Sequence, residues 1–321
     1  MHGRGVATSI GIRRGTAALT VALIACLVAA ACGGDALDVN FSKPESPAQS
    51  VRAGVPDGST LRVAVAPVLS VKTTSVLYQQ LTTYISQELG RPVELVQGKT
   101  YAEINDMLKS GDVTVALVCT NPYLQGKDDF GMELLAAPQV RGEVVYQSLL
   151  IVNRNSKANS LDDLRGATFA FSDPLSNTGR LAPLYQLARR GTNPDAFFSQ
   201  TIFTYSHDSS IRAVADGVVA AAAVDSLVFD YLASTEPALT DKVRVIDRWG
   251  PFGINPVVVN PRLDAGLKQD LQRLFLEMDK DPEGLALLRS LQIDKFIVPD
   301  DSLYDSVRAM RSYLRDRGLA P

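Results

Sequence analysis

Short apolar runs alternate with amphipathic stretches from Leu61 to the C-terminus, and this alternation limits the possible folds more than any other feature. The helix-like stretches carry apolar residues every three or four positions. Strands that alternate with helices are typical of a mostly parallel sheet covered on both faces, so the sequence predicts an α/β protein. The expected strands cover 61–67, 92–96, 113–118, 144–152, 167–171, 200–205, 220–224, 243–246 and 257–260. The expected helices cover 76–89, 101–108, 209–216, 227–232, 265–278, 283–291 and 302–314.

The chain is expected to cross twice between two α/β lobes, near Leu150 and near Asn255. About 260 residues follow the N-terminal segments, which is enough for two domains. The second crossing uses the Gly- and Pro-rich link Trp249–Pro256. The predicted lobe I comprises residues 60–151 and 256–321, and the predicted lobe II comprises residues 152–255. Two lobes joined by two strands make a hinge around a cleft that can close over a ligand.

The first 31 residues have the pattern of an export signal. Three arginines precede an apolar run of about 15 residues at 17–31, whereas a spanning helix needs about 20. Small residues followed by Cys32 resemble bacterial lipoprotein signals, in which the cysteine becomes lipidated after cleavage. Cys26 is an alternative lipidation site, although cleavage there would leave the apolar residues 27–31 at the mature start. An uncleaved anchor would leave the protein outside the same membrane.

Residues 32–59 are rich in Ser, Pro, Gly, Asp and Ala and predict a flexible tether. We therefore expect a lipid-anchored protein on the extracytoplasmic face of the cell membrane, with a signal peptide over residues 1–31.

Composition excludes several classes of function. Removing the three leader arginines from 32 Lys and Arg leaves 29 against 35 Asp and Glu, a net charge of about −6. No basic patch is present, which argues against nucleic acid as a partner. Cys119 would be the one cysteine left for the folded part, so no intramolecular disulfide is expected. His2 lies in the leader, so His207 is the single histidine of the exported protein. We expect no histidine-rich metal site and no cofactor.

The stretch Phe171–Gly179 has the character of a binding turn. An apolar strand ends there in a polar segment, and Ser176, Asn177 and Thr178 open a helix. The start of a helix offers unpaired N–H groups and the positive end of its dipole, which attract an anion. Ser and Thr are also common helix caps, so simple capping is the alternative.

His207 follows the next strand and precedes another helix. Loops of this kind line the crevice at the carboxyl ends of the strands, where ligands bind in open α/β sheets. Hydroxyl donors on one loop and an imidazole on its neighbour suit a tetrahedral oxyanion. The alternative is that His207 and the residues after it only cap the following helix.

The order and spacing of nine stretches resemble the solute-binding proteins of phosphonate and phosphite ABC importers, from Leu61 to about Arg311. The matching stretches are 61–67, 89–96, 101–103, 160–166, 171–179, 206–208, 213–217, 223–226 and 281–284. The resemblance implies the two-lobed type II periplasmic-binding fold. It also implies a monomer that captures a phosphonate, phosphite or related oxyanion and delivers it to an ABC permease, without catalysis.

The resemblance assigns roles to particular residues. Ser176, Asn177 and Thr178 would grip the phosphonate oxygens, and His207 would donate to the same group. Tyr101 and Tyr146 would close over the ligand from the first lobe, with a helix-start aromatic and a core strand residue as the respective alternatives. Asp225 and Asn255 would face the organic substituent, although Asp225 is equally suited to cap a helix.

Three positions depart from the family pattern. Ala220 stands where an acid is common, and Asn255 where an aspartate is common. Cys119–Asn121 replaces a turn that usually contains glycine. The residues that would bind the anion therefore match the family pattern better than those that would contact the organic part of the ligand.

Two other functional classes remain open. A sensory or partner-binding lipoprotein could use the same fold. An enzyme on this fold would need a reactive pair, for which only Cys119 and His207 are candidates.

Overall fold

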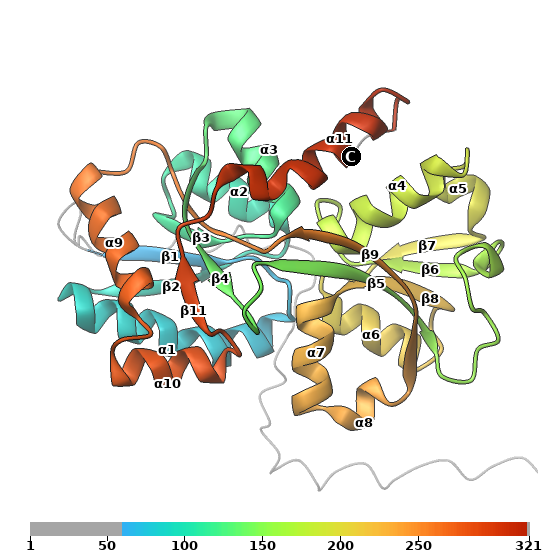
Figure 1. Ribbon diagram of the computed structural model, residues 1–321, viewed down its shortest axis with the longest axis horizontal. Coiled ribbons are helices and arrows are strands. Elements are labelled where there is room, and N and C mark those ends of the chain that lie inside the picture. The colour runs from blue at the N-terminus through green and yellow to red at the C-terminus, as the bar shows by residue number, and fades with distance from the viewer. Residues whose placement is uncertain (1–59, 320–321) are drawn as a thin grey trace, which may run out of the picture. The chain divides into compact units, whose positions relative to one another are not determined.

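The computed structural model describes residues 60–319, with the backbone alone described at residues 71–74, 76 and 77, and contains two β-sheets (Figure 1). The first sheet, in the order β11-β4-β10-β3-β1-β2, consists of β1 (Leu61–Val65), β2 (Val93–Gln97), β3 (Val115–Leu117), β4 (Glu133–Gln139), β10 (Val257–Val259) and β11 (Lys295–Ile297). The second, in the order β7-β6-β8-β5-β9, consists of β5 (Val145–Asn153), β6 (Thr168–Phe171), β7 (Gln200–Phe203), β8 (Ala221–Asp225) and β9 (Val243–Gly253). We call the first sheet with its helices lobe I and the second sheet with its helices lobe II.

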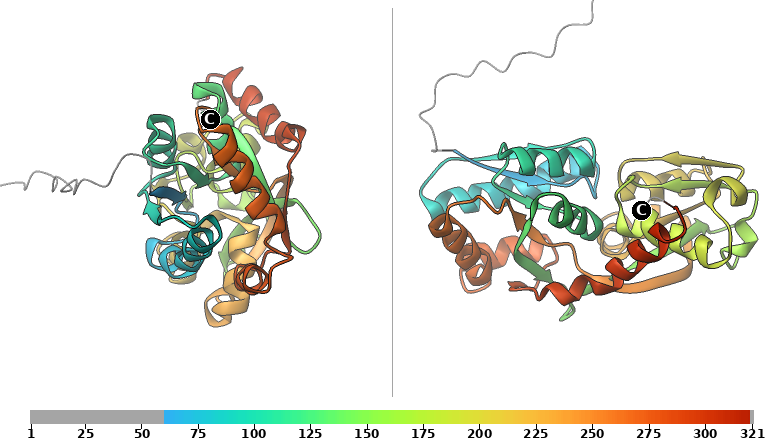
Figure 2. Two further views of the ribbon diagram at one scale, coloured as in Figure 1. Left: turned by 90° about the vertical axis from the view of Figure 1, so that its left-hand side faces the viewer. Right: turned by 90° about the horizontal axis from the view of Figure 1, so that it is seen from above.

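Helices cover both faces of each sheet (Figures 1 and 2). Those of lobe I are α1 (Val71–Leu89), α2 (Tyr101–Ser110), α3 (Thr120–Phe130), α9 (Ala265–Glu277) and α10 (Pro282–Ser290). Those of lobe II are the 3₁₀ turn η1 (Asp162–Leu164), the π-helical turn η2 (Asn177–Leu181), α4 (Ala182–Arg189), α5 (Pro194–Phe197), α6 (His207–Ala215), α7 (Ser226–Thr235) and α8 (Pro237–Thr240).

The sheets are mixed, so the expectation of a mostly parallel sheet is wrong. β1 runs parallel to β2 and β3, and β6 runs parallel to β7 and β8. β5, β10 and β11 are antiparallel to their neighbours. A crossover helix imposes parallel pairing, whereas β5 and β10 each arrive directly from the other lobe without one.

Further segments differ from the expected secondary structure, among them the short elements α5, α8 and β11, which were not expected. α3 and β4 occupy residues 120–139, where no regular element was expected, because Pro122 and Gly126 interrupt the apolar periodicity. β9 continues to Gly253 through a cis Gly250–Pro251 bond, so the expected Trp249–Pro256 link is mostly strand. β9 lies at the edge of its sheet, where proline is tolerated. β5 pairs in the second sheet from Val145 onward, although residues up to 151 were expected in lobe I. The exact boundaries of the lobes remain a prediction.

The small side chains of β8 allow its neighbours to approach closely. All five residues of Ala221–Asp225 are buried, and four of them are alanine or valine. Both η2 and α6 pack on this strand. The first turns of these two helices are therefore held next to each other at one edge of lobe II.

The C-terminal helix contacts both lobes. The 3₁₀ turn η3 (Asp301–Tyr304) leads into α11 (Asp305–Arg315), which packs on α3 in lobe I and on α4 and β9 in lobe II (Figure 2). Asp301 pairs with Lys127 of α3 at 2.7 Å. Tyr313 stacks edge to face on Tyr185 of α4, with the ring centroids 5.0 Å apart.

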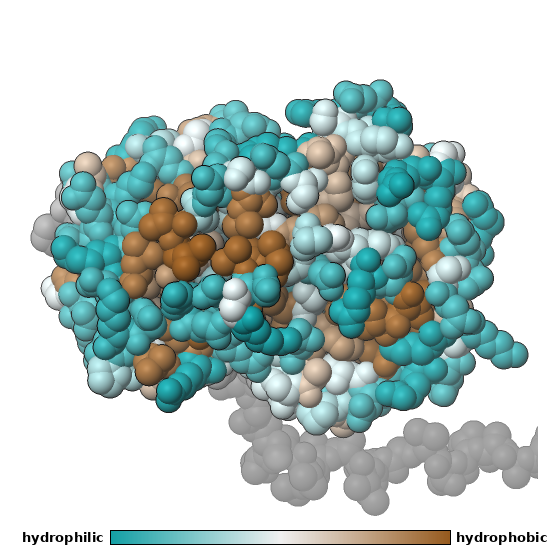
Figure 3. Space-filling model, in the orientation of Figure 1, coloured by the Kyte–Doolittle hydropathy of each residue, from teal (hydrophilic) through white to brown (hydrophobic). Residues whose placement is uncertain are grey.

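Apolar residues gather in separate patches divided by hydrophilic ones on the face shown in Figure 3. No helix within residues 60–319 is both long and apolar enough to cross a membrane. The predicted signal peptide, the tether and the lipidation site at Cys32 or Cys26 lie outside the described residues.

Candidate functional site

The turn after β6 is built as a helix start. Ser176 is the N-cap residue, and its hydroxyl accepts a hydrogen bond from Gly179 N–H at 3.0 Å. The turn η2 follows at once and continues into α4. The side chains of Ser176, Asn177 and Thr178 are fully buried. Capping is therefore confirmed for Ser176, whereas Asn177 and Thr178 do not cap the turn with their side chains.

Four buried polar atoms around this turn have no hydrogen-bond partner among the described residues. They are Tyr101 Oη, Ser172 Oγ, Asn177 Oδ1 and Thr178 Oγ1. Tyr101 opens α2 in lobe I, and the other three belong to lobe II. A buried polar atom left unsatisfied costs about 1–3 kcal/mol. A group of such atoms indicates a site that a polar ligand completes.

Glycine at position 179 lets these groups come together. A Cβ atom there would collide with the Ser172 hydroxyl and lie 3.0 Å from His207 Cε1. Tyr101 reaches the same turn, where its hydroxyl lies near Ser176 without the geometry of a hydrogen bond. Burial raises the pKa of Tyr101 well above its usual value, so this hydroxyl keeps its proton.

His207 is a neutral donor at Nε2. It is the first residue of α6, and its Nδ1 accepts the backbone N–H of Asp225 at 3.1 Å. An N–H group can only donate, so Nδ1 carries no proton and Nε2 carries it. Nε2 lies 3.4 Å from Ser176 Oγ. Burial lowers the pKa of His207 to about 3, against a smaller opposite effect of Asp208.

Tyr146 supports Asn177 through its hydroxyl. Tyr146 Oη accepts from Asn177 Nδ2 at 3.0 Å and donates to Thr120 Oγ1 at 3.2 Å. The Thr120 hydroxyl in turn donates to the Gly253 carbonyl at 2.7 Å. The expectation that Tyr146 reaches the site from lobe I is wrong, because its strand β5 pairs in the second sheet.

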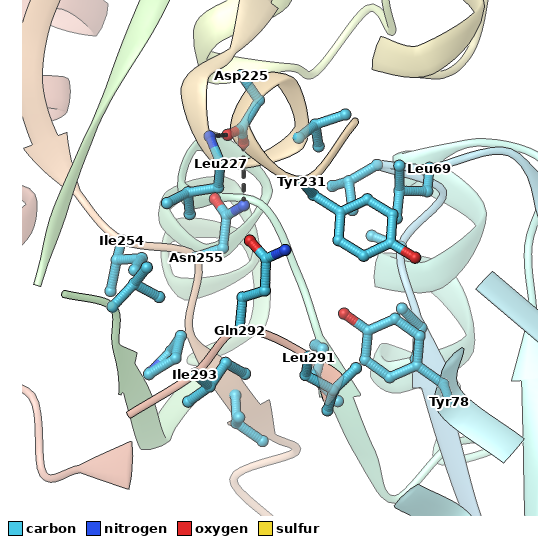
Figure 4. Close-up of a pocket in the computed structure, with 18 of the residues that line it drawn as sticks. Leu69, Tyr78, Asp225, Leu227, Tyr231, Ile254, Asn255, Leu291, Gln292 and Ile293 are labelled. Carbon is cyan, nitrogen blue, oxygen red and sulfur yellow. Dashed lines mark hydrogen bonds between the residues drawn. The ribbon is translucent and has the colours of Figure 1, made fainter. Parts of the chain in front are cut away.

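Asp225 and Asn255 join the polar cluster to a cavity. Asp225 caps α7, with Oδ1 accepting from Leu227 N–H at 2.7 Å and Oδ2 accepting from Asn255 Nδ2 at 3.3 Å (Figure 4). Burial raises the pKa of Asp225 to about 7. Both residues line a cavity of about 140 Å³ between the lobes. Most of its other walls are apolar, and the rings of Tyr78 and Tyr231 lie opposite each other (Figure 4).

Backbone hydrogen bonds connect the lobes around the site. His207 N–H donates to the Val68 carbonyl at 3.0 Å, and Ser70 N–H donates to Asp208 Oδ1 at 2.8 Å. On the other side of the turn, Tyr101 N–H donates to Asp173 Oδ2 at 3.2 Å. The described conformation therefore encloses the site between both lobes.

All eight residues expected at the site lie in one connected set, and the sequence interpretation missed further members. Ser172, Asp173 and Asp208 lie within the stretches that carried the family resemblance but received no role. Thr120 lies in the segment where no helix was expected. The missing signal is long-range: Tyr101 and Asp173 are 72 residues apart in the chain.

Cys119 and His207 do not form a reactive pair. Burial raises the pKa of the Cys119 thiol to about 11, and its Sγ lies 3.7 Å from Tyr146 Oη. The two nitrogens of His207 face Asp225 and Ser176 instead. Within residues 60–319, no group of three or more His, Cys, Asp or Glu side chains is placed to hold a metal ion.

Two curated proteins are similar to this chain in sequence. The phosphonates-binding periplasmic protein of Escherichia coli is 24% identical over 260 residues, which cover 78% of this chain and 77% of that protein. The phosphate-import protein PhnD of Mycolicibacterium smegmatis is 29% identical over 208 residues, which cover 62% and 61% respectively.

Solved structures and a family profile agree with these relatives. A binding component of a phosphonate ABC transporter from Pseudomonas aeruginosa superposes with a TM-score of 0.76 at 25% identity, covering 80% of this chain and 86% of that one. PhnD1 of Prochlorococcus marinus in complex with methylphosphonate gives 0.73 at 20% identity, with 80% and 98% covered. The predicted type II periplasmic-binding fold is thereby confirmed. The profile of phosphonate ABC transporter periplasmic substrate-binding proteins matches residues 63–304, so the chain belongs to this family.

Proposed function

We propose that the chain captures a phosphonate, phosphite or related oxyanion between its lobes and delivers it to an ABC permease. The observation that carries this proposal is the set of unpartnered hydroxyls of Tyr101, Ser172 and Thr178 beside the Nε2–H of His207. Each of these four groups can donate one hydrogen bond. They come from both lobes, so closure around a tetrahedral anion satisfies them together.

Neutral donors would hold the charge of the anion. Hydrogen bonds to a charged acceptor are about twice as strong as neutral ones. The helix start at Ser176 adds the positive end of a dipole. Arg180, the cation next to the turn, donates to the Pro174 carbonyl at 2.8 Å. A chain with a net negative charge thus binds an anion through local donors, not through its overall field.

The other expected residues would support these donors or contact the rest of the ligand. Ser176 caps the turn and Tyr146 orients Asn177. Asp225 and Asn255 form a polar part of the wall of the cavity that would take the organic substituent.

The protein would work outside the cytoplasmic membrane as a lipid-anchored monomer, held through Cys32. Binding without catalysis is consistent with a protonated Cys119 thiol and a neutral His207 that do not contact each other.

Isothermal titration with methylphosphonate, phosphite, phosphate, methanesulfonate and sulfate tests the ligand class. Ligand at about 100 times its Kd should stabilise the protein by about 2.7 kcal/mol. Ser172→Ala and Thr178→Val should each weaken the best ligand about 10- to 150-fold, because each removes a donor to a charged acceptor. Thr82→Val is the matched control, since the buried Thr82 hydroxyl donates to the Gln79 carbonyl within α1. Folded variants that bind like wild type would disprove the proposed site.

A further inference from the structure

We propose that Asn177 is a hydrogen-bond acceptor that selects oxyanions still carrying a proton, such as a phosphonate monoanion, over sulfonates and sulfate. This inference rests on the proposed function and names the chemical class of its ligand. It follows from the direction of a short chain of hydrogen bonds behind the site.

The chain of hydrogen bonds starts at the Gly253 carbonyl, which can only accept. Thr120 donates its one hydroxyl proton to this carbonyl at 2.7 Å. The Thr120 oxygen must therefore accept from Tyr146 Oη, which lies at 3.2 Å. Tyr146 has then used its one proton, so its oxygen accepts from the Asn177 amide at 3.0 Å. The nitrogen of the amide faces Tyr146, and Oδ1 is left buried without a partner among the described residues.

The neighbours of this chain leave its direction unchanged. Asn255 Oδ1 lies 3.4 Å from Thr120 Oγ1 and is a second acceptor for it, since Asn255 Nδ2 donates to Asp225. Cys119 Sγ lies 3.7 Å from Tyr146 Oη, and its thiol, which burial keeps protonated, can donate to that oxygen. Asn177 can therefore form its hydrogen bond with Tyr146 Oη only through its amide nitrogen.

Asn177 Oδ1 is the one of the four unpartnered atoms that can only accept, because the three hydroxyls can also donate. Asn177 is fully buried, and Oδ1 has no partner among the described residues. The monoanion of methylphosphonate offers a P–OH group to this acceptor and two further oxygens to the surrounding donors. Methanesulfonate has the same shape but no proton, so it would place a charged oxygen against Oδ1. A site built around a buried polar group rejects a ligand that leaves that group unpaired.

The same argument predicts a dependence on pH that follows the ligand. Affinity should fall as pH rises through the second ionisation of each ligand, when the P–OH proton is lost. Burial raises the pKa of Tyr101, Cys119 and Tyr146, so these groups stay protonated, and His207 stays neutral. Burial also raises the pKa of the remaining acids that face the site, Asp173 and Asp225. If these acids titrated, the affinity of every ligand would change with pH around the same midpoint. If the ligand titrates, the midpoints for phosphite, phosphate and methylphosphonate differ.

The test is a pair of dissociation constants, for methylphosphonate and methanesulfonate, measured near pH 6 on four proteins. Wild type should prefer methylphosphonate about 10- to 150-fold, the value of one hydrogen bond involving a charged group. Asn177→Ala should reduce this preference to a few-fold. Tyr146→Phe should also reduce it, because the amide is then free to turn its nitrogen to the sulfonate. Thr178→Ala is the control, which should weaken both ligands in the same proportion.

The outcomes separate the inference from the function on which it rests. Equal binding of both ligands by wild type would overturn the inference and leave the proposed function standing. A loss of both ligands in proportion in Asn177→Ala and in Tyr146→Phe would overturn it as well. If Asn177→Ala does not fold, Tyr146→Phe decides alone. Failure of wild type to bind any oxyanion of the panel would refute the proposed function itself.

Discussion

Replacing Tyr101 by Phe should change stability and binding in opposite directions. The substitution removes one hydroxyl that is fully buried and has no partner among the described residues. The ring stays, and so does the hydrogen bond from the backbone N–H of Tyr101 to Asp173. Without ligand, the variant should therefore be more stable than wild type. With ligand, it lacks a donor to the bound anion.

The two magnitudes follow from the state of the hydroxyl. An unsatisfied buried polar group costs about 1–3 kcal/mol, which is the upper limit of the stability gained in Tyr101→Phe. A gain of 1 kcal/mol raises the Tm of a domain of 150–250 residues by about 2–4 °C. A lost hydrogen bond to a charged acceptor raises Kd about 10- to 150-fold. Thermal unfolding without ligand and calorimetric titration with the best oxyanion measure the two effects.

Tyr304→Phe is the matched control. Tyr304 Oη is also buried and without a partner among the described residues, but it lies in η3 against Tyr123, with the ring centroids 4.9 Å apart. This variant should gain stability and keep its affinity. If Tyr101→Phe loses stability without ligand and binds as wild type does, then Tyr101 is a packing residue at a helix start and the reasoning fails.

Three further predictions concern other parts of the chain. The folded-state pKa of His207 is depressed to about 3 from 6.5, so its contribution to stability is present above pH 6.5 and is lost as pH falls toward 3. Unfolding of wild type and His207→Gln from pH 7 to pH 4 should show a difference that shifts steadily in favour of the variant; a constant difference would contradict the neutral imidazole. Asp225→Asn keeps a capping residue, so it should change the ranking of 2-aminoethylphosphonate against propylphosphonate but not phosphite affinity, and calorimetry showing equal loss for all three would make Asp225 purely structural. Cys32→Ser should release the exported protein from membranes or leave the precursor uncut, as fractionation and gel mobility would show, and the same result from Cys26→Ser instead would move the lipid to Cys26.

The sequence predicted those elements whose burial is local. β1, β6 and β8 appear as apolar runs because both faces of each strand are covered, and the runs end close to the observed bounds. The polar turn at Ser176–Thr178 was predicted from the residues alone, because a helix start leaves a signature within four positions. The predicted strand at 243–246 is shorter than β9, because pairing with β5 along the length of β9 outweighs the local preference of Gly250 and Pro251.

The polar chemistry of the site was less predictable, because it depends on which distant atoms meet. Ser172, Ser176 and Thr178 all have short hydroxyl side chains. The Ser176 hydroxyl accepts a hydrogen bond from a backbone N–H group, whereas the other two have no partner among the described residues. Nothing in the local sequence separates these cases. The orientation of Asn177 is set by a chain of contacts that ends at Gly253, in a different strand. Such assignments need the three-dimensional structure.

The unpartnered atoms also explain how binding can be coupled to closure. The lobes contact each other directly through pairs such as His207 N–H with the Val68 carbonyl and Ser70 N–H with Asp208. A net gain of about 0.5–1.5 kcal/mol for each such bond favours closure with or without ligand. Closing an empty site also takes the Tyr101, Ser172 and Thr178 hydroxyls away from water, at about 1–3 kcal/mol each, which opposes it. A ligand that bonds these groups removes that penalty in the closed state only, and this difference in affinity between the two states is what drives a conformational change.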